Sequence, residues 1–267
     1  MQALQATVEG IGFWGSGLPD WDSACAWVRT GQRPDAPPAR PAPQLLAANE
    51  RRRAPGTVVV ALEAALAACQ AADRAPDTLS SVFTSTHGEL SITDYMCATL
   101  ADDPRAISPT RFHNSVHNAA AGYWTIGAGA HVPATAITAG PYSFAQGLLE
   151  ALVQLHAGEE AVLLVAYDGS ASGPLAEPAP SEGLLGAALV LSRVACAGLP
   201  SLTVQLDTCA DASVADADAA PGPLTALLHG NAMQPMLPLL EALAMESEQV
   251  LLPAGRQQQL RIRLGHE

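Results

Sequence analysis

Residues 135–145 read TAITAGPYSFA, the pattern of a strand that turns sharply into a helix. We predict the strand over Ala134 to Thr138 and the helix over Tyr142 to His156, with Gly140-Pro141 as the break between them. Such a turn presents a residue to the free N–H groups and the dipole of the helix N-terminus, which stabilise a thiolate or an oxyanion. Many acyl-transfer enzymes place their nucleophile there. This chain has Gly140, so the turn has the backbone of such a site without the side chain.

No neighbouring residue supplies the missing nucleophile. Ser143 lacks an adjacent histidine that would activate it. The five cysteines are odd in number, irregularly spaced and without a CxxC pair, which is typical of reduced thiols in a cytoplasmic protein. They are Cys25, Cys69, Cys97, Cys196 and Cys209.

Strands and helices alternate on both sides of the turn. The apolar pattern predicts a helix over Thr57 to Ala72, which follows an extended proline-rich loop over Pro34 to Pro43 and a Trp-containing helix after Pro19-Asp20. We expect further strands over Leu4 to Ile11, Ser81 to Thr86, Ala161 to Tyr167 and Leu184 to Ser192. This alternation predicts an α/β fold with a largely parallel core sheet.

The composition changes after Arg193. A strand over Ser201 to Leu206, an acidic loop over Asp207 to Pro223, a helix over Pro235 to Met245 and a final strand over Gln259 to Leu264 form a short strand–helix–strand extension. We therefore predict a main domain over residues 1–198 and a smaller extension over residues 199–267.

Composition excludes several classes of function. All 13 basic residues are arginines, so Schiff-base chemistry, a lysine general base and a Walker-A phosphate loop are ruled out. A net charge of −13 disfavours nucleic acid as a partner, because that affinity comes from cationic side chains that neutralise phosphates. The longest apolar runs are too short to span a bilayer, and the N-terminal residues do not resemble a signal peptide. We expect a cytoplasmic protein without a cofactor.

Two short motifs allow alternative interpretations. Gly10, Gly12 and Gly15 match the dinucleotide fingerprint GxGxxG, but Ser16 to Pro19 interrupt the helix that should follow, so a plain turn at the end of a strand is favoured. Arg51-Arg52-Arg53 can grip a phosphate or an acidic partner, but solvated or acid-paired arginines are favoured.

A third motif places His113 and His117 four residues apart, which on a helix would put both rings on one face as metal ligands. A third ligand would come from His87, His131 or Asp94. Polar contacts at a buried or interfacial surface are the favoured interpretation, and we predict no metal site.

Three segments together resemble a known family. These are residues 112–126 (FHNSVHNAAAGYWTI), the Thr138-Ala139 turn into an alanine-rich helix, and residues 183–192 (GLLGAALVLS). In this order they look like the N-terminal half of a β-ketoacyl synthase of the thiolase-like superfamily, from about Val8 to Arg193. Within that superfamily the chain most resembles the short chain-length-factor subunits of aryl-polyene and xanthomonadin-like pigment pathways.

The resemblance implies a thiolase-like fold, with a complete N-terminal half and a truncated C-terminal half. It also implies a Cys-His-His site in which cysteine takes the acyl chain and two histidines drive decarboxylation of the malonyl extender. Gly140 falls at the cysteine position, His229-Gly230 matches neither histidine motif, and the family's lysine is missing. By this likeness the chain has no catalytic residue.

The same resemblance implies a non-catalytic subunit that pairs with a full-length ketosynthase and shapes its acyl pocket. Acyl carrier protein would be met only indirectly, through that partner. The interface and pocket candidates are Phe112, His113, Asn114, His117, Asn118, Tyr123, Trp124, Thr138, Pro141, Tyr142 and Phe144. The alternative is a weak acyl-thioester hydrolase or malonyl decarboxylase that uses His113 or His117 with the Gly140 turn as an anion hole.

Overall fold

The protein is described here by a computed structural model that covers residues 3–208 and 220–266. Cys209 and most of the predicted acidic loop lie outside the described residues. The elements are β1 (Leu4–Gly15), α1 (Trp21–Thr30), α2 (Ala48–Arg53), α3 (Gly56–Ala71), β2 (Ser80–Thr84), α4 (Leu90–Asp102), α5 (Pro109–His113), α6 (Ala119–Ala128), β3 (Ala134–Ile137), α7 (Ser143–Ala157), β4 (Ala161–Asp168), β5 (Leu185–Ser192), β6 (Ser201–Thr208), α8 (Pro223–Leu227), α9 (Leu237–Ala244), β7 (Gln249–Gly255) and β8 (Gln258–Gly265).

One sheet runs through the whole structure in the order β3-β2-β4-β5-β1-β6-β8-β7. Only the pairs β2–β3 and β2–β4 are parallel, and the remaining pairs are antiparallel. The prediction of a largely parallel sheet was wrong. A parallel pair needs a long crossover, usually a helix, but β4 reaches β5 through a loop that holds only a single 3-10 turn at Gly173–Ala176.

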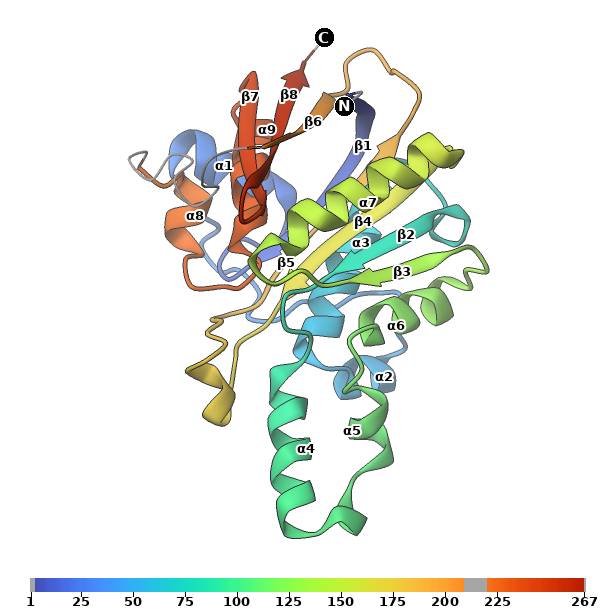
Figure 1. The fold of residues 1–267 in the computed structure, drawn as a ribbon, viewed down its shortest axis with the longest axis vertical. Coiled ribbons are helices and arrows are strands. Elements are labelled where there is room, and N and C mark those ends of the chain that lie inside the picture. Colours follow the sequence, from blue (N-terminus) through green and yellow to red (C-terminus); the bar gives the residue numbers. More distant parts are fainter. Residues whose placement is uncertain (1–2, 209–219, 267) are drawn as a thin grey trace.

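Helices cover both faces of this sheet. In Figure 1, α7 lies across one face and α3 across the other. The side chains of β4 alternate between the two cores: Val162 and Leu164 pack with α7, whereas Leu163 and Val165 pack with α3. Because both faces are covered, β4 and β5 are buried along their whole length, which explains their uninterrupted apolar sequence.

The glycines of the GxGxxG match lie inside β1, which continues to Gly15 instead of ending at Ile11. A Cβ on Gly12 would collide with the Ala64 carbonyl oxygen of α3, and one on Gly10 would collide with that of Ala68. These glycines therefore let α3 pack directly on the strand. The pyrophosphate-loop interpretation was wrong, and the strand-end turn holds only for Gly15, which ends β1 and exchanges backbone hydrogen bonds with Leu18 across the turn that follows.

The C-terminal segment continues the same sheet. β6 pairs with the start of β1, and β8 and β7 follow it as an antiparallel ribbon. The predicted strands β6 and β8 are confirmed, but β7 and the short helix α8 were not predicted. The predicted domain boundary falls in the loop between β5 and β6, and the division itself stays a prediction.

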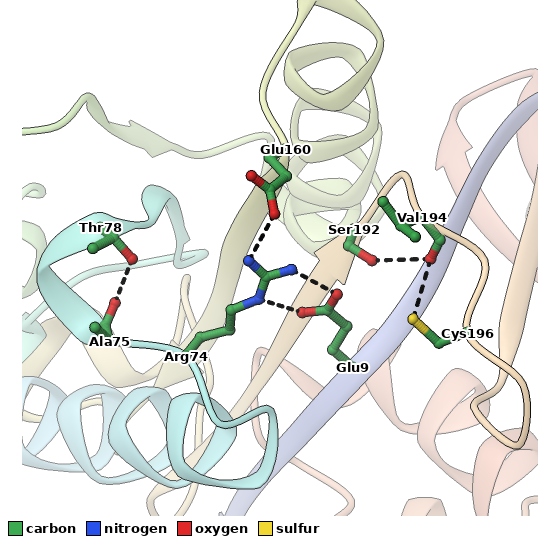
Figure 2. A network of polar contacts seen from close by, with 8 residues as sticks. All are labelled: Glu9, Arg74, Ala75, Thr78, Glu160, Ser192, Val194 and Cys196. Carbon is green, nitrogen blue, oxygen red and sulfur yellow. Dashed lines mark hydrogen bonds and ion pairs between the residues drawn. The ribbon is translucent and has the colours of Figure 1, made fainter.

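An ion-pair network fastens the end of α3 to the sheet (Figure 2). Arg74 donates from Nε and Nη2 to the two carboxylate oxygens of Glu9 in β1, at 2.8 and 2.9 Å, and from Nη1 to Glu160 at 3.0 Å. The side chain of Glu9 is 8% exposed and that of Glu160 is 74% exposed. Hydrogen bonds from Arg74 lower the pKa of Glu9 below its ordinary value of 4.5, against the effect of burial.

Candidate functional site

The carboxyl ends of the three mutually parallel strands meet at one edge of the sheet. β2 leads into Ser85 to Gly88, β3 leads into Thr138 to Gly140, and β4 ends at Asp168. Ligands of open α/β sheets commonly bind outside such strand ends. The predicted nucleophile turn lies here, between β3 and α7.

The turn itself places Gly140 in the left-handed region, with φ of +58°. This conformation is readily available to glycine and costs an ordinary residue strain. A Cβ added to Gly140 would have no atom within 4 Å. The position therefore has open space where a side chain would stand, and the backbone conformation is the main constraint on it.

The polar groups of the turn are largely bonded to one another. Ser143 is buried, and its Oγ accepts from the N–H of Ala139 at 2.9 Å and donates to the Gly140 carbonyl at 2.7 Å. The N–H of Tyr142 donates to the Ala139 carbonyl at 3.2 Å, that of Ser143 donates to the Gly140 carbonyl, and Pro141 has none. Over residues 139–143, only the Gly140 N–H is left without a partner in the structure. The turn lacks the set of converging donors that an anion hole requires.

Asp168 organises this end of the sheet. Its side chain is fully buried, and its carboxylate accepts from Ser85 Oγ at 2.6 Å, the Thr86 N–H at 2.8 Å and the His87 N–H at 3.2 Å. Burial raises the pKa of Asp168 above its ordinary value of 3.8, and these hydrogen bonds oppose the rise. The carboxylate thereby holds the loop after β2 against the end of β4.

That loop is in turn tied to the nucleophile turn. Thr138 Oγ1 donates to the Thr86 carbonyl at 3.1 Å. Thr86 Oγ1 lies 3.4 Å from the Gly140 carbonyl and 3.3 Å from the Ala232 carbonyl, within reach of either acceptor. Gly140, the loop after β2 and the segment after α8 therefore form one connected unit around Asp168.

Sequence reasoning missed Asp168 and its partners. The signal was present, because Asp168 directly follows the apolar run of residues 161–167, and Ser85-Thr86-His87-Gly88 directly follows another strand. Asn231, whose Nδ2 donates to the Glu182 carbonyl at 3.0 Å and the Gly183 carbonyl at 3.1 Å, carried no such signal.

The two predicted histidines do not share a helix face. α5 ends at His113, and His117 lies in the turn before α6. His117 Nε2 donates to the Ser85 carbonyl at 3.0 Å, whereas the exposed His113 ring packs edge-on against Tyr123 at a centroid distance of 6.0 Å. The helical-pair interpretation was wrong, because Asn114 ends the helix. Across residues 3–208 and 220–266, no group of three or more His, Cys, Asp and Glu side chains is placed to hold a metal.

The other predicted site residues fall into two groups. Trp124 and Phe144 pack inside the protein, in the cores on opposite faces of the sheet, which leaves them no surface for a partner. The remaining candidates lie at or near the surface, apart from Asn114, which is buried. The exposed ones are Phe112, His113, Asn118, Thr138 and Pro141.

The sequence pattern of one family matches most of the chain. The pattern for the β-ketoacyl synthase N-terminal domain matches residues 24–258. The chain belongs to the β-ketoacyl synthase family. A search of curated protein sequences finds no match.

Solved structures agree with this family in fold. A ketosynthase in complex with its chain length factor from Xenorhabdus doucetiae matches with a TM-score of 0.74 and 23% identity, over 97% of this chain and 99% of that one. The ishigamide ketosynthase/chain length factor matches with a TM-score of 0.70 and 16% identity, over 98% and 99% of the two chains. A type II polyketide synthase acyl-carrier protein in complex with its ketosynthase bound to the hexaketide matches with a TM-score of 0.73 and 13% identity, over 100% of both chains.

The fold is therefore thiolase-like, as the sequence predicted, and it is the fold of a ketosynthase N-terminal domain. In the part of the chain that the structure describes, no helix is long and apolar enough to cross a bilayer.

Proposed function

We propose that this β-ketoacyl synthase relative is a non-catalytic, chain-length-factor-like subunit. It pairs with a full-length β-ketoacyl synthase in the cytoplasm and shapes the acyl pocket during chain elongation in fatty-acid or polyketide-type biosynthesis, of the aryl-polyene kind. The observation that carries this proposal is Gly140: the turn that would present a nucleophile has no side chain. Ser143 cannot substitute, because it is buried and its hydroxyl is bonded within the turn.

A free sheet edge supports pairing. β3 stands first in the strand order and pairs only with β2 among the described strands. An unpaired strand edge presents a row of backbone donors and acceptors, which a partner strand satisfies. Pairing through β3 would put the Gly140 turn of this subunit beside the shared interface, because this turn directly follows β3.

Exposed apolar side chains lie next to this edge in the chain. Ile126, in α6 immediately before β3, is 78% exposed, and Phe112 and Val116 are 59% and 47% exposed. Large apolar side chains gathered on a surface mark interaction sites. A partner that covers these side chains removes their apolar surface from water, which stabilises the complex.

The same region supports a role in pocket shape. Phe112, His113 and Tyr123 are rings that a partner's acyl chain would meet at such an interface, and packed interiors resist added volume. The net charge of −13 supports indirect contact with acyl carrier protein, since carrier proteins are themselves acidic and like charges repel.

Coexpression tests this proposal. The full chain is produced with full-length ketosynthases from the same genome that retain their cysteine, and pairing is read by copurification and size exclusion. We expect one stable complex of the two proteins whose product length changes when Phe112 is replaced by alanine. Elution of the chain as a stable monomer beside every such ketosynthase would refute the pairing.

A further inference from the structure

A cavity of about 670 Å³ lies beside the start of α3, between α4 and α5, and the proposed pairing makes no use of it. Three charged side chains line it: Arg53 from α2, Arg111 from α5 and Glu89 from the start of α4. Ser91 and Thr110 add hydroxyl groups to the wall. The cavity therefore carries an excess of positive charge in a chain whose net charge is −13.

The two guanidinium groups are available to a ligand. Among the described residues, neither Arg53 nor Arg111 forms an ion pair. Arg111 stacks over the Tyr95 ring with its Cζ 3.9 Å from the ring centroid, which holds the group in place. Glu89 is occupied elsewhere, because its carboxylate accepts from Thr57 Oγ1 at 2.8 Å and from Ser91 Oγ.

A buried amide in the same wall lacks a partner. Asn114 is 3% exposed, lines the cavity, and has an Oδ1 that accepts no hydrogen bond within the described residues. Buried amide groups of native proteins nearly always have partners, so an orphan one indicates a missing ligand or water. Oδ1 can only accept, so the group that this amide offers to an anion is Nδ2, and turning Nδ2 toward the anion breaks no hydrogen bond of Oδ1.

A second cavity, of about 290 Å³, adjoins the first and is more apolar. Arg53 and Thr110 line both cavities, so the two meet there. The smaller cavity is walled by Leu46, Tyr123 and Ile126, and Glu50 and His113 also belong to its lining. Together the two cavities offer a cationic head region and an apolar body region.

We propose that these joined cavities bind an organic anion. Its carboxylate or phosphate group lies between Arg53 and Arg111 within reach of the Asn114 amide, and its apolar body lies against Tyr123, Leu46 and Ile126. Guanidinium groups match the oxygens of both anions in paired hydrogen bonds. Of the three consecutive arginines, Arg53 is thus the anion-binding one. All the lining residues come from this chain, so the site can be tested on the lone chain, and Tyr123 and Ile126 are shared with the proposed pairing surface.

Calorimetry on the full chain tests the site with three probes: octanoate, octyl phosphate and inorganic phosphate. We expect octanoate or octyl phosphate to bind at least about tenfold more tightly than inorganic phosphate, because only they fill the apolar cavity. Whichever of the two binds more tightly identifies the head group. Binding should weaken as ionic strength rises.

Variants locate the bound anion. Arg53→Gln should weaken binding about tenfold or more, and Thr110→Glu, at an exposed position shared by both cavities, should do the same without disturbing the core. Arg52→Gln is the matched control, since Arg52 is an exposed neighbour that does not line either cavity, and it should leave affinity within about twofold. The site is refuted if none of the probes binds, or if Arg52→Gln weakens binding as much as Arg53→Gln.

Discussion

Gly12 of β1 and Ala64 of α3 approach so closely that a Cβ on Gly12 would lie 1.9 Å from the Ala64 carbonyl oxygen. The contact brings backbone against backbone in the middle of the core, where neither element can withdraw without opening a void. It explains why two glycines stand two residues apart in a strand, where glycine is otherwise unfavourable.

Gly12→Ala should therefore destabilise the protein. Forcing a methyl group into this contact costs about 1–3 kcal/mol or more of unfolding free energy. Urea denaturation measures the loss. Gly122→Ala is the matched control, because a Cβ there meets no atom within 4 Å and the residue lies inside helix α6. That control should gain roughly 0.5–1 kcal/mol, and an equal loss in both variants would contradict the proposed contact.

Gly140→Cys should fold but should not restore catalysis. The left-handed backbone at φ +58° costs a non-glycine residue about 1–2 kcal/mol, while the open space avoids any clash. His117 Nε2 already donates a hydrogen bond to the Ser85 carbonyl, so this nitrogen cannot accept the proton of a new thiol. Turnover of a malonyl thioester by the Gly140→Cys variant would contradict this prediction. Turnover by the parent chain that disappears in His117→Ala would support the hydrolase or decarboxylase alternative.

Asp168→Asn should loosen the end of the sheet. An amide offers one oxygen where the carboxylate accepts from Ser85, Thr86 and His87, and its NH₂ would face an N–H donor. Leaving a buried donor unpaired costs about 1–3 kcal/mol. Since burial raises the folded-state pKa of Asp168, the folded protein holds this proton more tightly than the unfolded chain does.

The stability that Asp168 contributes is therefore greatest at low pH and is lost as pH rises from its ordinary 3.8 through the raised value. Unfolding free energies of both proteins across this range give the test. The advantage of the parent chain over Asp168→Asn should shrink with rising pH, and an advantage that grows would contradict the raised pKa.

The Glu9 carboxylate should behave in the opposite way. Its folded-state pKa is lowered by Arg74, so its contribution is present above the ordinary value of 4.5 and is lost as pH falls through the lowered value. At neutral pH, Glu9→Gln should cost about 1.5–3 kcal/mol, the range for hydrogen bonds to charged groups. Glu160→Gln serves as control: this partner of Arg74 is 74% exposed, so its loss should cost less than about 0.5 kcal/mol.

Ile126→Asp should abolish pairing with a ketosynthase while leaving the chain folded. The Ile126 side chain is 78% exposed, so an aspartate carboxylate at this position is solvated in the lone chain. In the pair the same carboxylate would be buried against an apolar surface, which opposes pairing. Val194→Asp is the matched control, because Val194 is also exposed, at 54%, but follows β5 away from the β3 edge. Copurification should fail for the first variant only, and equal behaviour of the two would place the interface elsewhere.

Long apolar segments made part of the fold predictable. The helices α3 and α7 and the strands β4 and β5 were located to within a few residues, because their apolar runs are long and end at clear breaks. Strand direction was not predictable in the same way. A strand covered on both faces has the same apolar sequence whether its neighbour runs parallel or antiparallel to it, as β4 and β5 illustrate.

The candidate site was predictable only where its residues are close in sequence. The turn around Gly140 could be read directly, since strand, break and helix follow each other. Asp168, Ser85 and Asn231 come together only through the fold, over sequence separations of 83 and 63 residues. The pairing of His113 with His117 failed for a local reason, because the helix ends between them at Asn114.

The two ends of the sheet differ in whether they accept another strand. Among the described strands, β3 ends the sheet with an unpaired edge, while at the other end β7 contains Pro253, which has no N–H to donate, and a bulge between Pro253 and Gly255. Growth by strand addition can therefore proceed from one side only. When two chains pair through their free edges, neither has a free edge left for a third chain. The geometry therefore favours a closed pair and opposes an open-ended filament.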